Sequence, residues 1–133
     1  MATVEQRTHA RSFLRKAEEY LASAEANLAA ERYTVAAGDA IHAGICAKDA
    51  IVTELIGATT KAKDHALAAK ELRQALGQRP DAAAAEKGMR DLVSSKAAVE
   101  YGVTLISAVK AEALVRRARS LFELAVRIVR LNG

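Results

Sequence analysis

The chain has 133 residues, the length of a single domain that can build one hydrophobic core without disulfides or a structural metal. Hydrophobic residues make up 51% of it but aromatic residues only 4%, and there is one proline, so we expect helices with a core of alanine and aliphatic side chains. A formal net charge of +4 is too small for a dedicated nucleic-acid coat protein, and the apolar runs are too short to span a bilayer.

The chain contains one cysteine, Cys46, which cannot form a disulfide within the chain. The sequence does not open with a charged and then apolar leader. We therefore expect a protein of the reducing cytoplasm. No motif in the chain indicates a cofactor.

Three helices are predicted in the first half of the chain. Apolar residues three and four apart form one stripe over residues 4–30, which is typical of a helix packed on one side. A second helix is expected over residues 34–56, capped by Thr34 and ended by Gly57. Small and apolar residues occur on nearly all of its sides, so it should be the central and most enclosed helix. A third helix, which carries leucines, is expected over residues 63–76.

Two further helices are predicted after the turn at residues 77–80, which contains the proline. Asp81 can cap the fourth helix, which Tyr101 and Gly102 end. Ser107 can cap the last helix, which runs to about residue 131. Five helices with short loops and no strand pattern predict an all-α, up-and-down antiparallel bundle that forms a single domain over residues 1–133.

A histidine and the cysteine belong to a row of polar residues on the second predicted helix. Spacings of three, four and three place four side chains on one helical face: Asp39, His42, Cys46 and Asp49. His42 and Cys46 could bind one zinc ion if Asp49 or His65 completed the ligand set. The favoured alternative is that Cys46 is a small buried side chain and His42 a hydrogen-bonded histidine of the core or of an interface. The sequence therefore predicts no metal site, and a catalytic Cys–His pair is less favoured still.

Lys96 interrupts the apolar stripe of the fourth predicted helix. Because an unpaired buried ammonium group is costly, its Nζ must reach a carboxylate, a ligand phosphate or open water. The simplest interpretation is that the aliphatic stem packs and the charged head reaches the solvent. The functional alternative is a ligand-binding site formed by Lys96, Glu100 and Tyr101, in which a phosphate supplies the counter-charge.

The last predicted helix carries most of the positive charge. Its six basic residues stand against Glu112 and Glu123, and this excess equals the formal excess of the whole chain. A solvated basic face is the commoner explanation of such a pattern. The alternative is a surface that contacts the phosphate groups of a nucleic acid. The arginines of this basic surface are Arg116, Arg117, Arg119, Arg127 and Arg130.

The order of the helix patterns resembles one known family. The second predicted helix has the pattern AxHAxxxAKDAIxxxL over residues 40–55, and the last has AxxLxxxAxxLFELAV over residues 111–126. Between them, Asp64-His65-Ala66-Leu67 opens a leucine-rich helix, and another helix ends with the stretch from Lys96 to Tyr101. Together these features resemble the HEPN superfamily, which consists of small helical-bundle proteins of prokaryotes.

The resemblance implies a bundle that dimerises through its later helices and works beside a nucleotidyltransferase or within a toxin–antitoxin pair. Many HEPN proteins are metal-independent ribonucleases that use an arginine and a following histidine near the end of the fourth helix. Lys96 stands at the arginine position here, and no histidine follows it within that spacing. Cleaving RNA without a metal requires groups that take and give a proton, and histidine suits this task near neutral pH. The ribonuclease motif is thus degenerate, and no catalytic residues are predicted.

We therefore expect a non-catalytic, HEPN-like helical module that forms a homodimer and binds a partner protein, with RNA or a nucleotide phosphate as a further ligand near Lys96 and Tyr101. The alternative is a divergent ribonuclease toxin in which Lys96, Tyr101 and Glu100 replace the usual catalytic pair. A second alternative is a purely structural scaffold, because the first two predicted helices also have the small-residue pattern of tetratricopeptide units, although no such repeat recurs.

Overall fold

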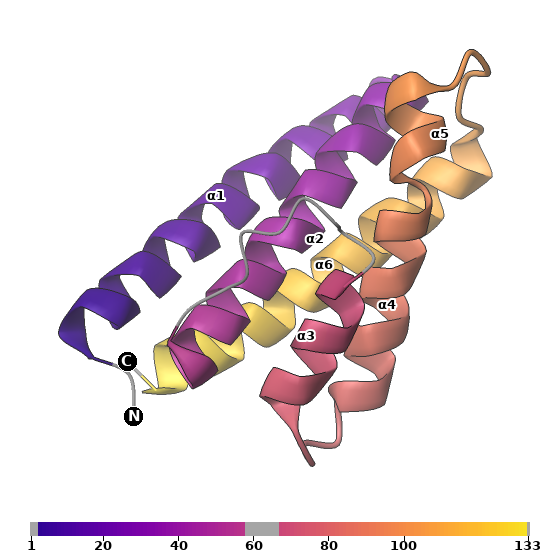
Figure 1. Cartoon of the computed structure of the whole chain (residues 1–133). Helices are drawn as coiled ribbons and strands as arrows, with labels where there is room; N and C mark the ends of the chain where they lie inside the picture. Colours follow the sequence, from indigo (N-terminus) through magenta and orange to yellow (C-terminus); the bar gives the residue numbers. More distant parts are fainter. Residues whose placement is uncertain (1–2, 58–66, 133) are drawn as a thin grey trace.

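Residues 3–57 and 67–132 are described by a computed structural model, and most of them are helical (Figure 1). The helices are α1 (Val4–Ala29), α2 (Tyr33–Ile56), α3 (Ala68–Leu76), α4 (Ala82–Ser94), α5 (Lys96–Tyr101) and α6 (Ala108–Asn132). Only Ser95 separates α4 from α5, so these two together correspond to the single fourth helix that the sequence predicts. No strand occurs in the described residues, and the prediction of an all-α bundle is confirmed.

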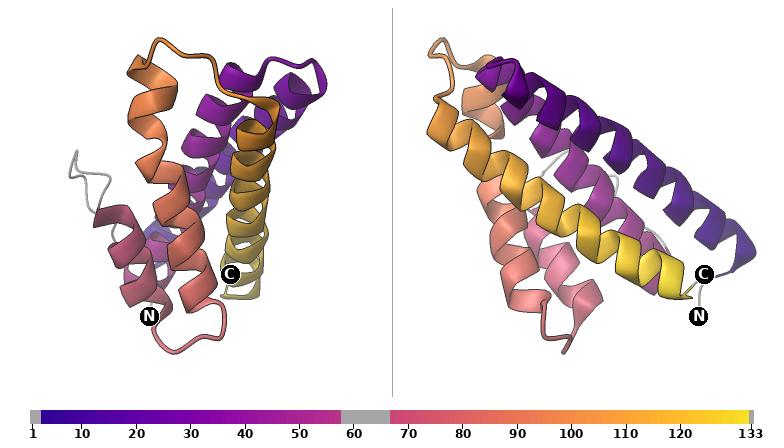
Figure 2. Two further views of the ribbon diagram at one scale, coloured as in Figure 1. Left: turned by 90° about the vertical axis from the view of Figure 1, so that its right-hand side faces the viewer. Right: turned by 180° about the vertical axis from the view of Figure 1, so that it is seen from behind.

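The three long helices α1, α2 and α6 lie side by side, and α2 is the central one (Figures 1 and 2). α2 packs against all five other helices. α3, α4 and α5 lie on the side of α2 that α1 leaves open, and α4 also packs against α6. The core therefore surrounds α2; α1, α3, α4 and α6 each contribute an apolar stripe to it, and the short helix α5 contributes Val99.

Small residues allow α2 to occupy this central place. At Gly44 a Cβ atom would lie only 2.5 Å from the Cδ1 atom of Leu92, so the missing side chain lets α4 approach closely. The larger residues Ile41 and Ile51 have no exposed surface and fill the remaining space. Six alanines of α2 are also fully buried: Ala36, Ala37, Ala40, Ala43, Ala47 and Ala50. The prediction that this helix is the most enclosed is confirmed.

Several predicted helix ends are confirmed. Gly57 ends α2 in the left-handed conformation, with φ of 108°, which glycine adopts at little cost. At the start of α6, the Ser107 Oγ atom accepts a hydrogen bond from the Lys110 N–H at 3.2 Å. A further cap, which the sequence interpretation missed, begins α1. There Thr3 and Gln6 form a reciprocal capping box, with hydrogen bonds of 2.7 and 3.1 Å.

Two other predicted caps are wrong. Thr34 does not cap α2, because the helix already begins at Tyr33 and the Thr34 Oγ1 atom accepts a hydrogen bond from the Ile106 N–H at 3.0 Å. Asp81 precedes α4, but its side chain makes no capping hydrogen bond and lies 3.8 Å from Arg127 of α6. In both cases the side chain that local spacing predicts as a helix cap interacts instead with a residue distant in the sequence. The predicted start of the third helix, at residues 63–66, lies outside the described residues.

A buried ion-pair cluster fixes α3 on α2. Lys48 of α2 is 5% exposed, and its Nζ atom lies 2.6 Å from Asp49 Oδ1 and 2.8 Å from Glu71 Oε1 of α3. Burial lowers the pKa of Lys48, but the hydrogen bonds and charges of Asp49 and Glu71 outweigh it, so the pKa is raised overall. The ammonium group therefore stays charged in the folded protein and joins the two helices.

Replacing Lys48 by methionine removes this charge and keeps a stem of similar length. We expect the variant to lose roughly 1–3 kcal/mol of stability at neutral pH, because two partly buried carboxylates lose their partner. Because the pKa of Lys48 is higher in the folded than in the unfolded chain, the charged lysine stabilises the fold fully at pH values below its unfolded-state pKa of about 10.4. This stabilisation is lost as the pH rises through the folded-state pKa of Lys48. Urea denaturation of both proteins at neutral and at alkaline pH should thus show a difference that shrinks with rising pH.

Lys87→Met is the matched control for this prediction. Lys87 pairs with Asp91 at 3.1 Å on the surface, with 63% of its side chain exposed, so its loss should change stability by less than about 0.5 kcal/mol. Equal losses in the two variants, or a Lys48→Met difference that stays constant with pH, would contradict the role given to the cluster.

Candidate functional site

The polar row that the sequence predicts on α2 is divided among separate partners. The Oδ2 atom of Asp39 accepts hydrogen bonds from the Ser23 Oγ at 2.6 Å and from the Asn27 Nδ2 at 3.1 Å, both on α1. The ring of His42 stacks on the ring of Tyr20, with centroids 5.2 Å apart. This face of α2 therefore lies along the margin of α1, where side chains keep part of their exposure.

Cys46 is half-buried, whereas the favoured sequence interpretation places it inside the core. Burial, and after it the carboxylate of Asp49, raises the pKa of the thiol, so the cysteine stays protonated at neutral pH. No group of three or more metal-ligating side chains occurs within residues 3–57 and 67–132. His65, the other ligand considered for zinc, lies outside those ranges.

Lys96 finds its counter-charge within the chain. Its Nζ atom lies 2.6 Å from Glu100 Oε2 and 5.9 Å from the centre of the Tyr101 ring. The same carboxylate reaches α2, because Glu100 Oε1 lies 3.4 Å from His42 Nε2. We refer to Lys96, Glu100 and His42 as the α5 cluster. Of the three partners considered for the ammonium group, the structure shows the carboxylate.

The α5 cluster brings a histidine to Lys96 that the sequence does not place there. Lys96 and Glu100 are four residues apart on one helix, a spacing that predicts their contact. His42 comes from α2, and no sequence pattern indicates that it reaches α5. The cluster holds the short helix α5 against α2 and leaves Tyr101, at the end of α5, 79% exposed.

Large apolar side chains gather at the end of the bundle where α5 is joined to α6. The turn between α1 and α2 lies at the same end (Figure 1 and the left view of Figure 2). Val103 is fully exposed and Leu105 is 83% exposed, and Leu105 lines a shallow hollow with the first turn of α2. The exposed apolar residues of this region form what we call the apolar end: Val35, Tyr101, Val103, Leu105 and Val109.

Charges of both signs surround the apolar end. Glu31 and Arg32 lie in or beside the turn before α2, and Lys110 and Glu112 lie near the start of α6, and all four are exposed. Loss of contact with water, and then the carboxylates of Glu31 and Glu112, raise the pKa of Tyr33, so both carboxylates lie near its hydroxyl group. An apolar centre with a mixed charged rim is the composition of a protein-binding surface.

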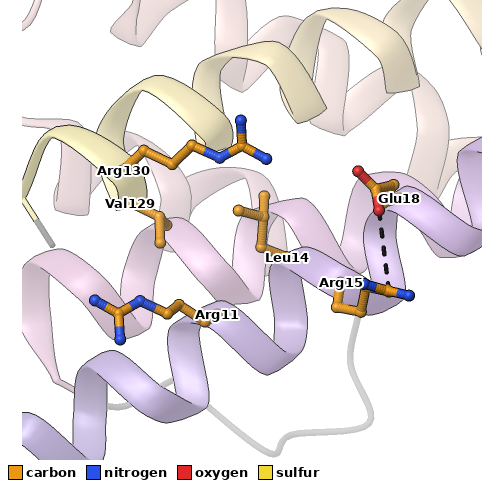
Figure 3. A pocket seen from close by; sticks show the side chains of 6 residues that line it. All are labelled: Arg11, Leu14, Arg15, Glu18, Val129 and Arg130. Atoms are coloured by element: carbon orange, nitrogen blue, oxygen red, sulfur yellow. Dashed lines mark ion pairs between the residues drawn. The ribbon is translucent and has the colours of Figure 1, made fainter.

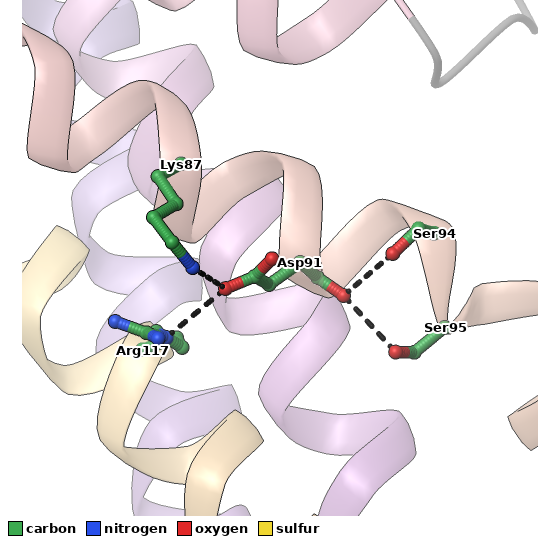
Figure 4. Close-up of polar contacts among 5 residues, drawn as sticks. All are labelled: Lys87, Asp91, Ser94, Ser95 and Arg117. Carbon is green, nitrogen blue, oxygen red and sulfur yellow. Dashed lines mark hydrogen bonds and ion pairs between the residues drawn. The ribbon is translucent and has the colours of Figure 1, made fainter.

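One arginine of the predicted basic surface belongs to a network between α4 and α6. The Nε atom of Arg117 lies 3.3 Å from Asp91 Oδ2, which also pairs with Lys87 at 3.1 Å (Figure 4). The backbone oxygen of Asp91 accepts hydrogen bonds from the hydroxyl groups of Ser94 and Ser95. The two serine hydrogen bonds lie at the end of α4, next to α5. The ion pair of Arg117 with Asp91 joins α6 to α4.

Two more of the predicted arginines also join helices. Arg119 lies 3.6 Å from Glu25 of α1, and Arg127 lies 3.8 Å from Asp81, which precedes α4. Within the described part of the chain, Arg116 and Arg130 form no ion pair, and both are exposed. The structure therefore brings Lys96, Glu100 and Tyr101 together but distributes the five arginines over different neighbours.

Comparison with known proteins assigns no family to the chain. No protein-family model, no curated protein and no solved structure matches it. The resemblance to the HEPN superfamily stays a prediction from helix patterns. Among the described residues, no helix combines the length and the apolar character needed to cross a lipid bilayer.

Proposed function

We propose that the chain is a non-catalytic, HEPN-like helical module that forms a homodimer through its apolar end. The observation that carries the proposal is the exposure of five large apolar side chains at one end of the bundle. Burying apolar surface gains about 25 cal/mol per Å², so exposed apolar side chains that gather at one end of a bundle are typical of a binding surface. The α5 cluster supports the proposal, because it fixes the helix that presents Tyr101.

The charged rim favours a second copy of this chain as the occupant. In a dimer with two-fold symmetry each surface meets itself, so a charged rim can pair with its own copy only if it carries charges of both signs. Glu31 and Arg32 on one side, with Lys110 and Glu112 on the other, meet this requirement. Dimerisation through the later helices is also what the HEPN resemblance implies.

The proposed module has further ligands. A nucleotidyltransferase or an antitoxin as its partner protein follows from the HEPN resemblance, and RNA or a nucleotide phosphate is the proposed small ligand. A phosphate at Lys96 would have to displace Glu100, which already pairs with it at 2.6 Å.

Leu105→Asp tests the dimer, because it places a charge in the centre of the apolar end. We expect wild-type protein to sediment as a dimer and Leu105→Asp as a monomer with unchanged helical circular dichroism, since desolvating a carboxylate opposes association. Val4→Asp is the matched control, because Val4 is similarly exposed (79%) at the opposite end of α1 and should leave the dimer intact. A wild-type chain that stays monomeric at all concentrations, or a Leu105→Asp variant that dimerises equally well, would refute the proposal.

The α5 cluster favours one other candidate function, a divergent metal-independent ribonuclease. His42 lies 3.4 Å from Glu100, which can orient its ring, and Lys96 is within the same cluster. In that reaction the imidazole takes the proton of the ribose 2′-hydroxyl, the 2′-oxygen forms a bond to phosphorus, the bond from phosphorus to the 5′-oxygen breaks, and the ammonium group of Lys96 gives the leaving 5′-oxygen a proton. Lys96, Tyr101 and Glu100, the residues that the sequence assigns to this alternative, would then act with His42.

RNA cleavage in the presence of a chelator separates the two functions. Our proposal predicts that wild type, His42→Ala and Lys96→Ala cleave a labelled single-stranded RNA no faster than buffer does. His9→Ala serves as the control, because His9 is an exposed histidine of α1 outside the cluster. Cleavage that is present in wild type and His9→Ala but lost in both other variants would establish the ribonuclease instead.

A further inference from the structure

A groove between α1 and α6 lies in the half of the bundle away from the apolar end. It has a volume of about 440 Å³ and is lined by Arg11, Leu14, Arg15, Glu18, Val129 and Arg130 (Figure 3). Leu14 and Val129 lie between the arginine side chains of the two helices and are 8% and 1% exposed. The surface that a ligand would meet therefore consists mainly of the aliphatic stems and the charged groups of the surrounding long side chains.

The walls are mainly positive. Three guanidinium groups stand against the single carboxylate of Glu18. Arg15 lies 4.0 Å from Glu18 and 3.5 Å from Glu19, so its charge is partly balanced. Arg130 forms no ion pair with any residue that the structure describes. The guanidinium group of Arg130 is thus available to an anionic ligand, and its planar fork suits a carboxylate.

We infer that this groove binds an acidic amphipathic helix of another protein. Apolar side chains of such a helix would lie against the aliphatic stems of the arginines that line the groove, and a flanking carboxylate would pair with Arg130. Two neighbouring helices with a groove between them offer the packing surface that a further helix needs. This site is separate from the proposed dimer surface, so both can be occupied in one molecule.

The lining of the groove disfavours a nucleic acid as the occupant. It contains no aromatic side chain on which a base could stack. The aliphatic stems of its arginines favour a ligand with apolar side chains over a phosphate backbone.

Fluorescence anisotropy with a labelled synthetic peptide tests the inference. The probe is a helical peptide with leucines on one face and glutamates beside them, and a scrambled peptide of the same composition lacks that face. We expect the helical peptide to bind wild type, and Arg130→Glu to weaken the binding by about tenfold or more through charge reversal. Arg116→Glu is the matched control, because Arg116 is an exposed arginine of the same helix outside the groove, without an ion pair in the described residues.

Four results would overturn the inference. They are absence of binding to the helical peptide, equal binding of the scrambled peptide, equal weakening by Arg116→Glu and Arg130→Glu, and tighter binding of a labelled single-stranded RNA that depends on Arg130. The last result would assign the groove to phosphate groups. Binding of the helical peptide that is weakened by Arg130→Glu and not by Arg116→Glu supports the inference.

Discussion

Six fully buried alanines and Gly44 line α2, so that neighbouring helices approach it with little side-chain volume between the backbones. Such a core gains stability from many short van der Waals contacts and needs few aromatic residues. α1 could not take the central place, because its buried residues form a single stripe. The arrangement of the bundle therefore depends on the small residues of one helix.

Contacts between aliphatic side chains hold helices close together but do not determine which residues of two helices face each other. In this bundle, polar pairs determine where α3 and α5 lie on α2. The ion pair of Lys48 with Glu71 joins α3 to α2, and the contact of Glu100 with His42 joins α5 to α2. The second contact also places Tyr101, at the end of α5, in the apolar end of the bundle. On the proposed function, the apolar end and the groove lie at different ends of the bundle, so that self-association and binding of a second protein would not compete.

The sequence predicts the helices well, because alanine content and apolar stripes are local properties. It predicts the enclosed position of α2 for the same reason. It does not predict that His42 meets Glu100, or that Thr34 accepts a hydrogen bond from Ile106, since these contacts depend on which helices become neighbours. The groove is unpredictable for the same physical reason, because its arginines come from α1 and α6. The contact of Lys96 with Glu100 was predictable from a spacing of four.

Native-state hydrogen exchange tests the central claim about α2 most directly. If α2 is the enclosed helix around which the others pack, its amides at residues 40–52 should exchange only through global unfolding, with a protection free energy equal to the free energy of unfolding. The short helix α5 and the exposed connection that follows it, at residues 102–107, should exchange much faster. Protection in α2 that is lower than in α1 or α6 would contradict the account.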